Sequence, residues 1–179
     1  MKRALWIPAV ALLASVAGCI LVSAQIFTTF DLENIHVTGA TGMDHQQVDL
    51  NTIGDYKDHK DNFKTLADFA VVGDFSHPQG TTVNVEVYIT PGFTNYTTPS
   101  QVTANATLLW GPFQLQAGEL NHHMGWTESA KVLHDPGKQV LIDAAKGDGQ
   151  FTVYAFGVVG DHDFDVTNGK LLLVLDVAK

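Results

Sequence analysis

The sequence predicts an all-β fold, an antiparallel β-sandwich of the immunoglobulin-like or a related type, with two short helices. Apolar and polar residues alternate along several short stretches, which is typical of strands that bury one face. Clusters of turn-forming residues separate these stretches at short intervals. Only two stretches change to a helical spacing of apolar residues. The alternative is a two-layer α+β domain with both helices on one face of a sheet.

The first predicted strand covers residues 25–37, with a break at residues 31–34. A polar, glycine-containing loop follows over residues 39–45, and a short strand over residues 47–53. The first predicted helix covers residues 55–66, where four side chains recur at spacings of three and four residues and so share one helical face. These four are Tyr56, His59, Phe63 and Leu66.

The clearest strand pattern covers residues 82–90, where valine or isoleucine occupies every second position. Residues 69–76 form another apolar stretch of the same kind. Residues 77–80 contain one proline and one glycine, which predicts a turn between the two strands. We therefore expect the two strands to form a β-hairpin.

The second half of the chain continues the pattern of strands and turns. Gly111 and Pro112 predict a kink or bulge in a strand, and Asp135-Pro136 predicts the start of a helix that ends before Gly147. The predicted elements are a loop over residues 91–101, strands over residues 102–110, 119–126, 150–159 and 170–177, and a helix over residues 136–146.

Length and charge limit the class of protein. The 179 residues suit one domain, and the single cysteine offers no intramolecular disulfide. The chain has 10 Lys and Arg against 19 Asp and Glu, a formal net charge of −9. Such a charge repels nucleic-acid phosphates, so we expect no nucleic-acid partner. Membrane contact then has to come from the N-terminus and not from a basic patch.

The N-terminus has the parts of a secretory signal, with Lys2 and Arg3 followed by an uncharged run over residues 4–24. Within this run, Val16-Ala17-Gly18-Cys19 resembles the lipobox of bacterial lipoproteins, which is an aliphatic residue, a small residue, Gly or Ala, and then Cys. The resemblance covers residues 1–19 and implies cleavage before Cys19 and a diacylglycerol on its sulfur.

Three segments follow from this resemblance. Residues 1–18 would be the lipoprotein signal peptide, residues 19–25 a lipid-anchored linker, and residues 26–179 a single β-rich domain. Loss of Lys2 and Arg3 with the signal would change the net charge from −9 to −11. Two or more acyl chains hold a protein stably on a membrane. The domain would then face the periplasm or the exterior from the bacterial cell envelope.

Two other interpretations of the N-terminus stay open. Val22-Ser23-Ala24 is typical of an ordinary cleavage site, which would release a soluble secreted protein. The uncharged run of 21 residues is also long enough for a single transmembrane anchor, which needs about 20. Lys2 and Arg3 would then stay on the cytoplasmic side.

Three alternating carboxylates, Asp161, Asp163 and Asp165, are the candidate metal ligands. Their spacing matches the first three ligand positions of a calcium-binding EF-hand loop. Val166 stands where that loop needs glycine, and Leu172 stands where it needs a bidentate glutamate, so an EF-hand is excluded. On an extended chain, the three carboxylates would point the same way and could bind a hard cation loosely.

The histidines and serines do not form a catalytic pattern. His122 and His123 are adjacent in a predicted strand and point to opposite faces, so they cannot hold one metal ion together. His59 is expected to be buried on the helix face. No serine lies in a nucleophile-elbow sequence and no glycine-rich phosphate loop is present. We predict no catalytic residue and no cofactor.

The expected function is a binding or structural role in the cell envelope, without catalysis. The expected partners are the membrane, through lipid on Cys19, and a protein of the envelope. One alternative is a carrier of an apolar ligand in a cavity of the sandwich, and another is a metal-dependent hydrolase that uses Asp161, Asp163 and a histidine. The aromatic residues that suggest the carrier are Trp110, Phe113, Trp126, Tyr154 and Phe156.

Overall fold

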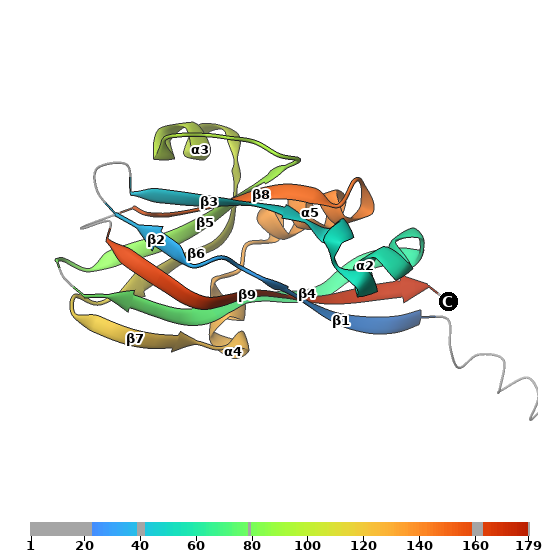
Figure 1. The fold of residues 1–179 in the computed structure, drawn as a ribbon, viewed down its shortest axis with the longest axis horizontal. Coiled ribbons are helices and arrows are strands. Elements are labelled where there is room, and N and C mark those ends of the chain that lie inside the picture. The colour runs from blue at the N-terminus through green and yellow to red at the C-terminus, as the bar shows by residue number, and fades with distance from the viewer. Residues whose placement is uncertain (1–22, 39–41, 79, 159–162, 179) are drawn as a thin grey trace, which may run out of the picture.

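The computed structural model describes residues 23–38, 42–78, 80–158 and 163–178. Two antiparallel sheets pack together, as Figure 1 shows, which confirms the predicted all-β sandwich. Their facing apolar side chains form one continuous core, and the two-layer α+β alternative is not observed.

Sheet A has five strands in the order β1-β9-β4-β7, and β2 also pairs with β9. β1 pairs with β9 from Ser23 opposite Ala178 to Asp31 opposite Lys170. β2 pairs with the earlier part of the same edge, so the predicted break near residues 31–34 is where the chain passes from β1 to β2. The strands are β1 (Ser23–Asp31), β2 (Ile35–Val37), β4 (Phe63–His77), β7 (Glu119–Met124) and β9 (Phe164–Ala178).

Sheet B has four strands in the order β3-β8-β5-β6. β6 carries the bulge predicted at Gly111 and Pro112, because Val85 pairs with Phe113 whereas Val87 pairs with Trp110. Two residues of β6 therefore lie opposite one residue of β5. The strands are β3 (Met43–Asp49), β5 (Val83–Pro91), β6 (Thr107–Leu115) and β8 (Gln150–Gly157).

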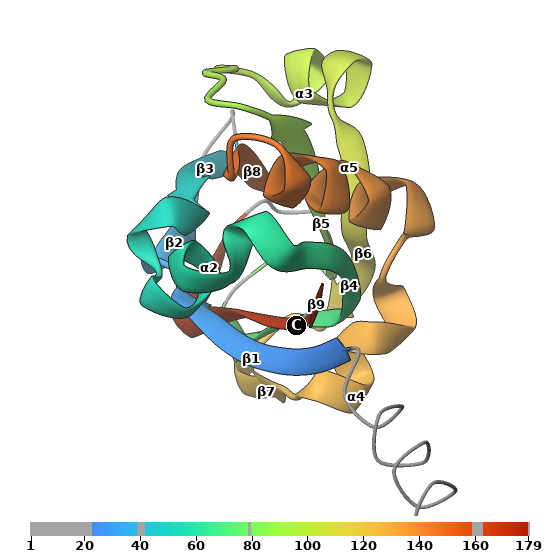
Figure 2. The same cartoon turned by 90° about the vertical axis from the view of Figure 1, so that its right-hand side faces the viewer.

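The described residues contain four short α-helices and not two, namely α2 (Gly54–His59), α3 (Pro99–Asn105), α4 (Trp126–Ser129) and α5 (Asp135–Lys146). α5 agrees with the prediction and buries Leu141 and Ala145 in the core. The hydroxyl of Tyr56 on α2 donates to the carbonyl of Ala145 at 2.7 Å. α2 and α5 therefore lie side by side at one end of the sandwich (Figure 2).

The predicted helix over residues 55–66 is only half correct. α2 ends at His59, a short 3-10 turn covers Lys60–Asn62, and β4 begins at Phe63. Pairing with β9 overrides the helical spacing here, because Leu66 lies opposite Leu175 in the sheet. His59 is consequently exposed and not buried as expected.

The predicted hairpin is wrong, although both of its strands exist. β4 pairs with β9 and β7 in sheet A, while β5 pairs with β6 and β8 in sheet B. The segment after His77 therefore crosses from one sheet to the other. The His77 ring is buried at this crossing, where its nitrogens lie 2.5 Å and 2.6 Å from the carbonyls of Asp163 and Thr81.

α3 occupies residues that were predicted as loop and strand. Its start has two recognised signals, since the Thr98 hydroxyl accepts the N–H of Gln101 at 3.3 Å and Pro99 occupies the first turn. α3 covers a second apolar cluster on the outer face of sheet B, formed by Val102, Tyr154 and Phe156.

Candidate functional site

The predicted metal ligands are only partly described. Asp161 lies outside the described residues, as does Cys19, and Asp163 is exposed just before β9. Asp165 on β9 contacts the ring of His36 on β2, and this hydrogen bond raises the pKa of His36. Within the described residues, no three His, Cys, Asp or Glu side chains are placed to hold a metal ion. The metal site stays a prediction.

A cavity of about 70 Å³ opens between the two sheets, along the seam between β2 and β3. Its inner wall is apolar and comes from both sheets, whereas its rim is largely polar. The wall consists of Val48, Val71, Val87, Leu109, Val153, Ala155 and Leu171, and the rim consists of residues 32–35 and 44–46.

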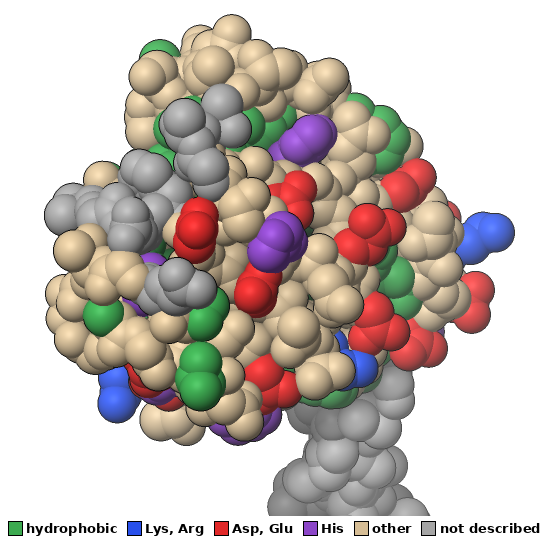
Figure 3. Space-filling view, turned by 60° about the vertical axis from the view of Figure 1, so that its left-hand side comes forward, with side chains coloured by type: hydrophobic (Ala, Val, Ile, Leu, Met, Phe, Trp, Pro, Cys, Tyr) green, Lys and Arg blue, Asp and Glu red, His purple; other side chains and the backbone are tan. Residues whose placement is uncertain are grey.

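Side chains of β3 bridge the rim. The Gln46 side-chain oxygen accepts the N–H of Glu33 at 3.1 Å, and the Asp44 carboxylate accepts the N–H of His36 at 3.4 Å. Figure 3 shows a face on which carboxylates and histidines are interspersed and lysines are few. Glu33, Asp44 and His45 are among the polar residues that line the cavity.

The size of the cavity limits what it can bind. Pockets for drug-sized ligands have volumes of about 300–1,000 Å³, and an engineered apolar cavity of about 150 Å³ holds benzene. A cavity of about 70 Å³ fits a small apolar group, such as the end of an alkyl chain, but not a whole lipid.

The aromatic residues that suggested a carrier do not line this cavity. Trp110 and Phe113 pack around Phe75 in the core, with ring centroids 5.8 Å apart in each pair. Tyr154 and Phe156 belong to the cluster under α3 on the outer face of sheet B. These four aromatic residues therefore do not line this cavity, and the carrier stays a prediction.

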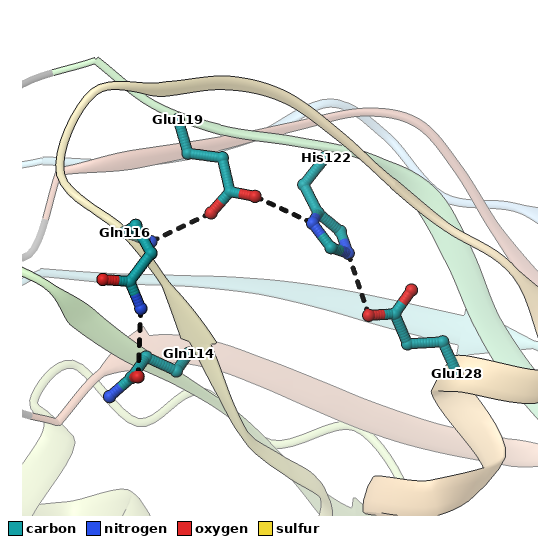
Figure 4. A network of polar contacts seen from close by, with 5 residues as sticks. All are labelled: Gln114, Gln116, Glu119, His122 and Glu128. Atoms are coloured by element: carbon teal, nitrogen blue, oxygen red, sulfur yellow. Dashed lines mark hydrogen bonds and ion pairs between the residues drawn. The ribbon is translucent and has the colours of Figure 1, made fainter.

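A network of polar contacts surrounds His122 on β7 (Figure 4). One ring nitrogen lies 2.8 Å from the Glu119 carboxylate and the other 3.0 Å from the Glu128 carboxylate on α4. Glu119 also accepts the N–H of Gln116 at 2.9 Å, and the ring of Phe113 lies 4.9 Å from that of His122. The network thus joins β7, the turn before it and the helix after it.

The charges of this network are set by its hydrogen bonds. Burial lowers the pKa of His122, but its bonds to Glu119 and Glu128 outweigh this effect and raise the pKa above its ordinary value. The N–H of Gln116 is the main cause that lowers the pKa of Glu119, against the effect of burial. Carboxylates only accept hydrogen bonds, so the ring satisfies both when it is doubly protonated. A ring in that state offers no free nitrogen to a substrate or a metal, and the network holds α4 against β7.

His123 points to the other face of β7, as predicted for adjacent strand residues. Its ring lies 2.7 Å from the Asp74 carboxylate, which also accepts the Asn168 side-chain amide at 2.9 Å. The bond to His123 is the main cause that lowers the pKa of Asp74. The two histidines therefore have separate partners and do not form one site.

Sequence reasoning did not find the cavity or the partners of His122. The cavity walls come from six strands, and Glu128 reaches His122 only because the chain turns from β7 into α4. The sequence contains no signal for either arrangement beyond the alternation of apolar residues.

Comparison with known proteins adds no family. No protein-family model and no curated protein matches the chain. Among the described helices, none has the length and apolar character needed to cross a membrane.

Proposed function

We propose that this chain is a bacterial lipoprotein whose β-sandwich is displayed outside the cytoplasm and has a binding or structural role in the cell envelope. The observation that carries the proposal is the sequence Val16-Ala17-Gly18-Cys19 behind a basic start and an apolar run. Its partners are the membrane, through lipid on Cys19, and a protein of the envelope.

The start of the domain supports cleavage before Cys19 over cleavage after Ala24. β1 begins at Ser23, and Ser23 and Ala24 pair with Ala178 and Val177 of β9. Cleavage after Ala24 would remove these two residues from the strand, whereas cleavage before Cys19 leaves the strand complete.

Intact mass and membrane fractionation test the proposal. We expect native protein to start at Cys19, to carry the mass of a diacylglycerol, and to remain in the membrane fraction. In Cys19→Ala, the mature lipidated form should be absent from the membrane fraction. The matched control Ser15→Ala keeps the thiol and should still give that form. An intact N-terminus with an unmodified thiol would refute the proposal and support the transmembrane anchor.

A second candidate function is the binding of a small apolar group in the cavity at the β2–β3 seam, as supported by its apolar wall. Native mass spectrometry of the chain purified from membranes should detect the bound group. Ala155→Met would fill the cavity and should abolish the adduct, while Val158→Met, at an exposed position after β8, should keep it. Absence of any adduct on the unmodified chain would remove this candidate.

A further inference from the structure

We propose that the outer face of sheet A rests on the membrane, with Phe27 and Trp126 in contact with neutral lipid. Phe27 on β1 exposes 57% of its surface, while Ile26 and Thr28 on either side turn toward the core. Its ring lies 6.3 Å from that of Trp126 on α4, and its partner on β9 is Val174, which is half-buried. Phe27, Trp126 and Val174 are called the Phe27 patch below.

The patch lies on an open side of the sandwich. In Figure 2, β1 and α4 lie together at the lower side of the molecule, while α2, α3 and α5 lie above sheet A. On this face the exposed ring of Phe27 and the half-buried side chains of Trp126 and Val174 leave apolar surface in contact with water.

The chain before β1 indicates what this surface meets. This inference rests on the proposed lipid at Cys19, which lies four residues before Ser23. Four residues of extended chain span at most about 14 Å, and Phe27 lies about 13 Å further along β1. The anchor therefore has no long spacer, and it holds the strand that carries Phe27 close to the bilayer. Among the described residues near the start of β1, Phe27 is the large aromatic side chain that is exposed, and Trp126 beside it is half-buried.

The chemistry of the patch fits a neutral lipid surface. Tryptophan and other aromatic side chains are favoured at the boundary between lipid and water. The charged side chains of the neighbouring strands do not form a basic patch for anionic lipid, because Lys170 is paired with Asp31 at 2.8 Å and Asp68 and Asp176 add negative charge. Contact would come from burial of apolar surface, so it should not depend on salt.

Tryptophan quenching by brominated lipid tests the contact. Lipidated full-length mature protein is placed in zwitterionic phosphatidylcholine vesicles with brominated acyl chains, which quench tryptophan that touches them. Trp110 is fully buried, so Trp126 reports contact. We expect quenching at low and high salt and its loss in Trp126→Phe. Phe27→Asp should remove most of the quenching, while Phe93→Asp, an exposed aromatic residue after β5 in sheet B, should not.

The outcomes separate this inference from the proposed function. A lipidated, vesicle-bound protein whose fluorescence is not quenched would overturn the membrane contact and leave the anchor intact. Chemical cross-linking that gives a dimer through β1, lost in Phe27→Asp, would assign the patch to a second copy and also overturn it. An unmodified Cys19 in the mass spectrum would instead refute the anchor itself.

Discussion

The hydroxyl of Ser129 accepts hydrogen bonds from both sheets, and its removal should be among the most destabilising small changes in the domain. Ser129 is fully buried on α4 and accepts the N–H of Val71 on β4 and the indole N–H of Trp110 on β6, each at 2.9 Å. Val71 needs this partner because β7 covers the edge of β4 only as far as Gly73, where Met124 pairs with it. Ser129 thus completes the edge of sheet A and fixes Trp110.

Ser129→Ala would leave two buried donors without an acceptor. An unsatisfied buried donor costs about 1–3 kcal/mol, so the loss of two should lower the free energy of unfolding by about 2–6 kcal/mol. For a chain of this size, 1 kcal/mol corresponds to about 2–4 °C in the melting temperature. The expected decrease in the melting temperature is therefore about 4–24 °C.

Thermal unfolding of the purified chain, followed by tryptophan fluorescence, measures this decrease. Thr127→Ala, an exposed change on the same helix, is the matched control and should stay within about 0.5 kcal/mol. In a Trp110→Phe background, only the Val71 donor remains, so Ser129→Ala should cost about half as much. A Ser129→Ala protein as stable as the control would refute the reasoning.

Two further predictions concern a close contact and a charged network. Gly137→Ala should lower the melting temperature, because a Cβ there would lie 2.4 Å from the main chain of β6. The control Gly54→Ala should not lower it, because a Cβ there would have no atom within 4 Å. Equal decreases in the two variants would contradict this close packing. His122→Ala should lower the free energy of unfolding more at about pH 6 than at about pH 9. The pKa of His122 is higher in the folded state than in the unfolded state, so the charged ring stabilises the fold fully only below the unfolded-state pKa. This stabilisation is lost as the pH rises through the folded-state pKa. Urea unfolding at both pH values measures this, and an equal loss of stability at both would contradict the role of the charged ring.

The strands were largely predictable because each buries one face, and this leaves a period of two in the sequence. The break after β1, the bulge at Gly111 and the helix from Asp135 were also predictable, because each depends on a few neighbouring residues. The same local reasoning could have found α3, where Thr98 and Pro99 form a recognised helix start. The apolar residues after Pro99 favour a strand, but the helix start at Thr98 and Pro99 decides the local structure.

The pairing of strands was not predictable, because it depends on residues far apart in the chain. β4 and β5 both have the alternation of a hairpin, but β4 finds β9, about 100 residues later, and β5 finds β6 and β8. The turn at His77 looks the same in sequence whether the next strand joins the same sheet or the opposite one. The end of α2 is a similar error, because β9 draws Phe63 and Leu66 into a strand.

The candidate sites depend on this pairing even more strongly. His122 and Glu128 are six residues apart and meet across a change from strand to helix. Asp165 and His36 lie opposite each other on the neighbouring strands β9 and β2, 129 residues apart in the sequence. The cavity exists only because β2 and β3, at the edges of different sheets, leave a seam between them. No spacing within one segment could predict these contacts.

The position of β1 connects the anchor with the rest of the surface. Because Ser23 pairs with Ala178, β1 begins where β9 ends, at one end of the sandwich. β1 then runs for nine residues, about 30 Å of strand, before it reaches the rim of the cavity at Leu32. A lipid at Cys19 would therefore hold the start of β1 at the membrane and leave the cavity rim, with Glu33 and Asp44, at the far end of that strand. If a partner in the envelope binds this domain, the rim is the polar surface that the fold keeps furthest along β1 from the anchor.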